Sequence, residues 1–227
     1  AQYTLLTNAE GGIVDDLIIY RLADQDYLVC ANAANLAKDF AWMCKNNRGA
    51  QMEDHSEKWA QIAIQGPKAR TLAARIFGPE LEDVKPFWFM QKRFKGAEAI
   101  IARTGYTGED GVEVFIKNEG APALWQELMT KGADLSVKAI GLGARDTLRT
   151  EMKFSLYGHE IDDTTNPIEA GLGWVIKPKK GDFIGRGPIV AKLEGGVNRK
   201  LIGFKLLDKG IPRADYELYS FDNVKMG

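Results

Sequence analysis

Cysteine and histidine are scarce in this chain of 227 residues, which has two of each. Cys30 and Cys44 lie in apolar stretches and do not form a metal-binding pair. We expect both to be buried free thiols in a reducing compartment such as the cytoplasm. His55 and His159 lie in separate polar segments, and nothing pairs them as metal ligands or catalytic partners. We therefore expect no metal site.

Net charge and long apolar runs are also lacking. The formal net charge is −1, which argues against general attraction to nucleic acid or to an anionic membrane surface. No apolar run approaches the ~20 residues that a membrane helix needs. The 45% hydrophobic and 27% charged residues are ordinary for a globular protein with room for one domain or slightly more.

Both ends of the chain look like internal sequence. The first residues, "AQYTLLT", lack a Met and already resemble the middle of a strand. The last, "YELYSFDNVKMG", follow shortly after another strand-like stretch. We expect the chain to be a piece of a longer protein.

Strand and helix patterns interleave along the chain, which indicates an α/β or α+β fold. A hairpin turn is expected at Gly11-Gly12, and Asn32 or Asn35 is placed to cap a helix. Strands are expected at 3–7, 13–20, 27–31, 59–65, 97–103, 111–116, 174–177 and 199–207. Helices are expected at 36–44, 69–76, 124–129, 141–152 and 183–193.

Adjacent carboxylates in "IVDDLIIY" are the first candidate site. Side chains alternate along a strand, so Asp15 and Asp16 point to opposite faces and cannot act as a close pair on one substrate. One is free to face a cleft while the other faces solvent or caps a turn. Alternatively, both flank the turn and serve only the Gly11-Gly12 hairpin.

The segment "RTGYTGEDGVEV" is the second candidate. Gly105, Gly108 and Gly111 allow positive φ angles and close approach to a flat ligand, and Tyr106 adds a ring. Glu113 shares a strand face with Gly111, where its carboxylate could accept hydrogen bonds from an amino-pyrimidinone edge. The alternative is an exposed glutamate on an edge strand.

Two arginines in "GLGARDTLRTEM" are the third candidate. Arg145 and Arg149 are four residues apart on one helix face. A cation near a helix start opposes the helix dipole, so helix stability does not explain Arg145. A substrate or a buried carboxylate would explain it, as would a structural ion pair with Asp146 or Glu151.

Seven motifs in order give the chain a specific resemblance. "NAEGGIVDDLIIYR", "CANAANLAKDF", "IQGP", "RTGYTGEDGVEV", "GLGARDTLR", "LYGHEID" and "TNPIEAGLGWVIK" resemble the T-protein (aminomethyltransferase) family of the glycine cleavage system, from about Tyr3 to about Lys205. The resemblance implies an α+β fold of interleaved sheets with packed helices. It further implies a folate-binding domain at 1–196, lacking the family's N-terminal segment, and the truncated start of a C-terminal β-barrel domain at 197–227.

The resemblance also implies a reaction, which takes place in the cytoplasm or, in a eukaryote, in the mitochondrial matrix. Family members take a one-carbon unit from the aminomethyl-lipoyl arm of the H-protein, pass it to tetrahydrofolate and release ammonia. Asp16 matches the catalytic carboxylate, Glu113 the acid that grips the pterin edge, and Arg145 the binding arginine. The folate-pocket positions matched less closely are Tyr3, Asn32 and Tyr106. An aromatic position of the family is Phe154 here.

Two related functions compete with this interpretation. One is another tetrahydrofolate-dependent demethylase of the same superfamily; the intact "GGIVDD" and "GLGARD" favour the T-protein. The other is a non-catalytic folate-binding module, which would carry a reactive-cysteine motif, "KGCYxGQ", where this chain has "TNPIEAGLGW". A purely structural role would leave Asp16, Glu113 and Arg145 without a reason to converge.

Overall fold

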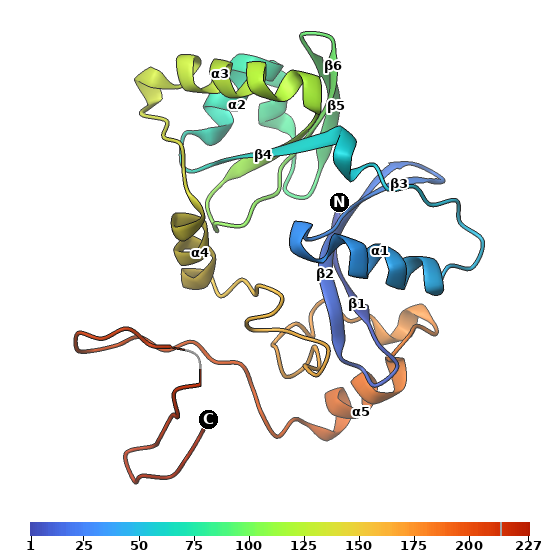
Figure 1. The fold of residues 1–227 in the computed structure, drawn as a ribbon, viewed down its shortest axis with the longest axis vertical. Helices are drawn as coiled ribbons and strands as arrows, with labels where there is room; N and C mark the ends of the chain where they lie inside the picture. Colours follow the sequence, from blue (N-terminus) through green and yellow to red (C-terminus); the bar gives the residue numbers. More distant parts are fainter. Residues whose placement is uncertain (214) are drawn as a thin grey trace.

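Two antiparallel sheets form the frame of the protein (Figure 1). The computed structural model describes residues 1–213 and 215–227. The first sheet has the order β1–β2–β3, with strands Gln2–Thr7, Ile13–Ala23 and Asp26–Cys30. The second has the order β4–β7–β6–β5, with strands Trp59–Gln65 (β4), Phe89–Phe94 (β5), Ala97–Ala102 (β6) and Gly111–Lys117 (β7).

The predicted hairpin joins β1 to β2. Gly11 has a φ of 85°, and the backbone N–H of Gly12 donates to the side chain of Asn8 at 2.7 Å. A Cβ on Gly12 would lie 1.7 Å from the carbonyl oxygen of Asp163. The turn therefore requires glycine at 12, where the hairpin packs against a distant loop.

The register of the first sheet decides which side chains share a face. Leu5 pairs with Asp16 and Tyr3 pairs with Ile18, so these four side chains lie on one face together with Tyr20. The opposite face carries Asp15, next to the helix α1 (Leu36–Lys45). Alternation along β2 thus separates the two adjacent aspartates, as the sequence predicted.

The second sheet is covered on both faces. On one face Val112, Val114 and Ile116 pack against the helices α2 (Ala69–Phe77) and α3 (Ala121–Lys131), which lie above the sheet in Figure 1. On the other face, Phe115 of β7 meets Tyr20 of β2 with ring centroids 5.2 Å apart. The two sheets therefore face one another, and Glu113 lies on the same side of β7 as Phe115.

Two further helices follow the sheets: α4 (Leu142–Glu151) and α5 (Arg186–Gly195). Short 3-10 turns lie at Ala33–Asn35 (η1), Ser56–Lys58 (η2), Pro79–Asp83 (η3), Asn118–Gly120 (η4), Ala133–Leu135 (η5) and Pro178–Lys180 (η6). The interleaved antiparallel sheets and packed helices confirm the α+β class. The strand β5 was not predicted, because "FMQKRF" offers no clean alternation of apolar and polar residues.

The strands expected at 174–177 and 199–207 are wrong. Both segments lack regular strand pairing, and the part of the chain described beyond residue 196 holds only one isolated bridge, between Tyr219 and Lys225. This last segment extends away from the two sheets in Figure 1. A strand needs a neighbouring strand for its backbone hydrogen bonds. The Leu201 N–H donates to the Glu169 carbonyl at 2.9 Å, but no strand of the described residues pairs with the segment 199–207. The start of a β-barrel is not seen, and the division at residue 196 stays a prediction.

Both cysteines are free, as expected, but the expected burial is wrong for one of them. Cys30 is partly buried on the inner face of β3, whereas Cys44 is exposed on α1. None of the helices among the described residues combines the length and the apolar character needed to cross a membrane.

Candidate active site

Asp16 lies on the inner face of β2 with two donors on its carboxylate. The Tyr3 hydroxyl donates to Oδ2 at 2.9 Å, and the Asn32 amide donates to Oδ1 at 3.1 Å. Burial raises the pKa of Asp16, the Asp15 charge raises it further, and the two donors oppose this rise. Burial beside Asp16 also raises the pKa of Tyr3, which keeps the phenol protonated as a donor. Each oxygen of Asp16 retains a lone pair for a further donor.

Asp15 has a different environment, and neither the solvent-facing nor the turn-capping prediction holds. Its side chain is fully buried. Oδ1 accepts the Asn32 amide at 2.8 Å and Oδ2 accepts the Asn35 amide at 2.7 Å. The turn is held instead by Asn8. Because neither aspartate serves the hairpin, the alternative that both are turn residues is wrong.

Asn32 and Asn35 occupy helix N-cap positions but do not cap. Neither side chain bonds to the first backbone N–H groups of its helix. The amide of Asn32 contacts the carboxylates of both Asp15 and Asp16. The expected capping is therefore wrong for a physical reason: the carboxylates of β2 take these amides as their donors.

Glu113 is partly buried on β7, between β4 and β6, so the edge-strand alternative is wrong. Its Oε1 accepts the Gln61 amide at 2.8 Å, and its Oε2 accepts the Thr104 hydroxyl at 2.6 Å. Burial raises the pKa of Glu113, while Thr104, the Arg145 charge and Gln61 lower it. The carboxylate is held in place by neighbours that the sequence alone did not identify.

Contacts within the protein explain two of the three glycines before Glu113. Gly108 has a φ of +76°, but Gly105 and Gly111 are not in the positive-φ region. A Cβ on Gly105 would lie 2.0 Å from the Gln65 side chain, and one on Gly111 would lie 2.3 Å from the Ile64 carbonyl oxygen. Packing, rather than approach to a ligand, accounts for Gly105 and Gly111.

Arg145 and Arg149 on α4 have separate surroundings. Arg149 is buried and pairs with Asp146 at 2.7 Å and with Glu160 at 2.6 Å. Arg145 has no carboxylate within ion-pair distance in the part of the chain that the structure describes. Its guanidinium lies 4.4 Å from the centroid of the Tyr106 ring. The expected structural ion pair is made by Arg149, which leaves Arg145 without that explanation.

Two pairs of stacked rings flank these charges. Tyr3 stacks on Trp174 with centroids 5.6 Å apart, and Tyr106 stacks on Phe154 at 6.0 Å. The Trp174 side chain is 62% exposed. Sequence reasoning missed Trp174 as a site residue, although it stands inside the motif "GLGWVIK".

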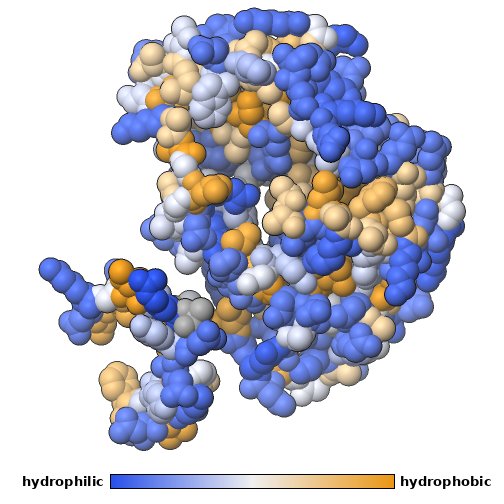
Figure 2. Space-filling view, viewed as in Figure 1, coloured by the Kyte–Doolittle hydropathy of each residue, from blue (hydrophilic) through white to orange (hydrophobic). Residues whose placement is uncertain are grey.

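Tyr106 lies near two of the predicted residues, Asp16 and Arg145. Burial raises the pKa of Tyr106 to about 12. The charge of Asp16 adds to this rise, and the charge of Arg145 opposes it. The charge of Arg145 also lowers the pKa of Glu113. In Figure 2 the surface is hollowed between α4 on one side and α1 on the other. Arg145 thus lies against Tyr106, and Tyr3 and Asn32 are bound to Asp16; that these residues share one site with Glu113 stays a prediction.

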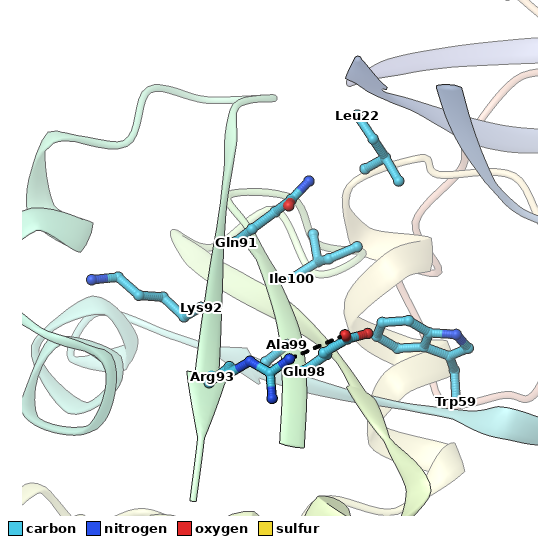
Figure 3. Close-up of a pocket in the computed structure, with 8 residues that line it drawn as sticks. All are labelled: Leu22, Trp59, Gln91, Lys92, Arg93, Glu98, Ala99 and Ile100. Atoms are coloured by element: carbon cyan, nitrogen blue, oxygen red, sulfur yellow. Dashed lines mark hydrogen bonds and ion pairs between the residues drawn. The ribbon is translucent and has the colours of Figure 1, made fainter. Parts of the chain in front are cut away.

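A separate cavity of about 540 Å³ lies between the end of β2 and the strands β5 and β6 (Figure 3). Leu22 and Trp59 line it. Its charged residues Arg93 and Glu98 face each other at 3.5 Å, and Lys92 pairs with Glu80 outside it. None of the predicted site residues lines this cavity, and its charges already have partners.

The fold is that of an α+β protein with two facing sheets, and the site combines carboxylates, a guanidinium and aromatic rings. Residues 1–180 match the family model described as GCVT N-terminal domain. The chain belongs to this family, which confirms the resemblance to the T-protein of the glycine cleavage system.

Known relatives cover the whole chain. It is 60% identical to an aminomethyltransferase of Bdellovibrio bacteriovorus over 100% of this chain and 63% of that protein. It is 44% identical to an aminomethyltransferase of Caldanaerobacter subterraneus over 99% of this chain and 61% of that protein. The crystal structure of glycine cleavage system aminomethyltransferase T from Bartonella henselae superposes with a TM-score of 0.87 at 32% identity, covering 100% and 62% of the two chains. The chain thus spans a little over three fifths of these relatives' length.

Proposed function

We propose that the protein carrying this chain is the aminomethyltransferase of the glycine cleavage system. It would transfer the one-carbon unit of an aminomethyl-lipoyl arm, presented by the H-protein, to tetrahydrofolate and release ammonia. One observation carries the proposal: the Asp16 carboxylate is held by Tyr3 and Asn32 on the sheet face that looks toward Glu113 and Arg145.

The residues present fit tetrahydrofolate as the co-substrate. A pterin presents a row of N–H donors along its amino-pyrimidinone edge, and Glu113 is a partly buried acceptor with free lone pairs. Arg145 supplies a planar cation without a protein carboxylate partner among the described residues. The ring of Trp174, which is 62% exposed and stacks on Tyr3, offers a flat surface against which a pterin could stack.

The bonds that change define what Asp16 has to do. Two carbon–nitrogen bonds to folate form, while the bonds from the carbon to sulfur and to the ammonia nitrogen break. The two protons that leave the folate nitrogens end on ammonia and on the dihydrolipoyl thiol. Asp16 would orient the folate nitrogens and help to move these protons, and its negative charge would stabilise the iminium-like carbon as ammonia leaves.

The raised pKa of Asp16 suits this role. A carboxylate whose pKa lies closer to neutral exchanges protons with the substrate more readily than an exposed aspartate. Tyr3 and Asn32 fix its orientation, so the charge does not need to reorganise during the reaction.

Steady-state kinetics of Asp16→Ala in the intact protein test this function. We expect methylene-tetrahydrofolate formation to fall on the order of a hundredfold or more, with tetrahydrofolate affinity by calorimetry largely kept. Asp83→Asn, an exposed change on the 3-10 turn after α2, is the matched control and should behave like the wild type. Turnover by Asp16→Ala at the wild-type rate would contradict the assigned role.

A further inference from the structure

Two buried acids lie behind Asp16, on the opposite face of β2. Asp15 and Asp39 both have 0% exposed surface. Asp15 accepts the amides of Asn32 and Asn35 and also the backbone N–H of Asp16 at 2.8 Å. Asp39, on α1, has no hydrogen-bond donor on either oxygen within the described residues. The proposed reaction has so far used neither acid.

A single cation stands between these acids. The Lys38 ammonium lies 3.9 Å from Oδ2 of Asp15 and 3.5 Å from Oδ1 of Asp39. It also donates to the carbonyl of Val14 and lies 3.7 Å from the centroid of the Tyr157 ring. If both acids were ionised, two buried negative charges would share one positive charge.

A proton on Asp39 resolves this imbalance. An ionised buried carboxylate without donors is expensive, and such a group usually takes up a proton instead. The charged groups that face it are Asp15 from β2 and Lys38 from its own helix. Asp16 shares the Asn32 amide with Asp15, and the Tyr157 ring lies against the Lys38 ammonium. Burial and the Asp15 charge raise the pKa of Asp39, and Lys38 only partly opposes the rise.

We propose that Asp39 is a protonated acid that donates its proton to Asp15, and that Asp15, Asp39 and Lys38 form a neutral unit that positions Asn32 against Asp16. These three are positioning residues for the reaction proposed above, and their importance for turnover rests on that proposal. The protonation state of Asp39 does not depend on the proposed function.

Asn32 connects the unit to Asp16. Its amide nitrogen lies 2.8 Å from Asp15 Oδ1, 3.1 Å from Asp16 Oδ1 and 3.0 Å from the Asp16 carbonyl oxygen. Because one amide group serves both aspartates, any displacement of Asp15 moves a donor of Asp16. A shift of this kind at a catalytic carboxylate lowers turnover without removing a substrate contact.

Carbon-13 NMR of the aspartate carboxyl groups in the intact protein tests the protonation state. We expect one aspartate resonance to stay in the protonated position at pH 5, where an ordinary aspartate is ionised, to titrate near pH 7, and to disappear in Asp39→Asn. A spectrum in which Asp39 titrates near the ordinary value of about 3.9 would overturn the proposal. This readout does not depend on the reaction, so it separates this inference from the proposed function.

Kinetics of matched variants test the positioning role. Asp39→Asn keeps a donor toward Asp15, so turnover should stay close to the wild type. Asp39→Ala and Lys38→Met should lower kcat by about tenfold to a hundredfold with little change in the KM for tetrahydrofolate. Lys45→Met, at the exposed end of α1, is the control for lysine loss.

The pattern among these variants is decisive. Rescue of Asp39→Ala turnover in Asp39→Asn supports a donor at this position rather than a general need for packing. Equal losses in Asp39→Asn and Asp39→Ala, or unchanged turnover in both Asp39→Ala and Lys38→Met, would overturn the positioning role.

Discussion

Glu113 shows how a single side chain is prepared to bind. Thr104 and Gln61 each donate to one of its oxygens, and Arg145 adds a positive charge nearby. Burial raises the pKa of Glu113, and these three neighbours oppose the rise, which favours the ionised form. The proposed contact with the pterin therefore depends on the charge of Glu113 and not only on its shape.

Replacing Glu113 with glutamine tests this dependence. Glu113→Gln keeps the size but loses the charge, so tetrahydrofolate affinity should fall about tenfold to a hundredfold, the usual value of a hydrogen bond to a charged group. Isothermal titration calorimetry of the intact protein measures it. Glu119→Gln, exposed on the turn before α3, is the control. Unchanged affinity in Glu113→Gln would remove Glu113 from the binding site.

The pH dependence of stability tests the environment of Asp39. A raised native pKa means that the native state holds a proton that the unfolded chain has lost, so the free energy of unfolding falls as pH rises above about 4. Each unit by which the native pKa is raised corresponds to about 1.4 kcal/mol. Asp39→Asn should therefore become more stable relative to the wild type between about pH 4 and the native pKa, as measured by urea unfolding. A difference that does not change with pH would contradict this.

At the scale of elements, most of the fold could be predicted from local patterns. The alternation in "IVDDLIIY" and the glycines before it define β2 and the hairpin, and all eight of the helices and strands expected before residue 120 have their counterparts. The strand β5 was not predicted, because its pairing with β6, rather than its own residue pattern, makes it a strand. The segment 199–207 has a strand-like pattern, but no strand of the described residues pairs with it.

The site was only partly predictable for the same reason. Asp16, Glu113 and Arg145 stand in recognisable motifs. Their supports come from other elements: Gln61 lies on β4, and the Asn35 amide reaches β2 from the start of α1. A local sequence pattern cannot predict contacts between residues that lie this far apart in the sequence.

The β1–β2 hairpin offers a test at this scale. Gly12→Ala would place a methyl group against the Asp163 carbonyl, so the turn or the loop has to move. We expect a loss of about 1–3 kcal/mol in the free energy of unfolding, as for other overpacked sites. Gly187→Ala, on α5 with open space around its Cα, should be neutral or slightly stabilising. Similar denaturant midpoints for Gly12→Ala and the wild type would show that the turn tolerates a side chain.

At the scale of the whole molecule, the contact between the two sheets sets the geometry of the site. Tyr20 is fully buried, and its ring meets Phe115 and Phe89 edge to face. Its hydroxyl lies 3.2 Å from that of Thr104, the residue that donates to Glu113. The packing that joins the sheets thus also supports one of the proposed binding residues.

Truncating Tyr20 tests this junction. Tyr20→Ala should lower the free energy of unfolding by about 3–5 kcal/mol, the usual cost of removing a buried aromatic ring. Tyr27→Ala, at a position 53% exposed, should have little effect. Equal thermal midpoints for the two variants would mean that the sheets do not depend on Tyr20 for their contact.

We propose that Asp16, Glu113 and Arg145 line one folate site between the facing sheets and α4. A crystal structure of the intact protein with bound tetrahydrofolate tests it most directly. We expect the pterin edge to lie within hydrogen-bond distance of Glu113, with Asp16 beside the folate nitrogens that accept the one-carbon unit. Folate bound elsewhere, for example in the cavity lined by Leu22 and Trp59, would contradict it.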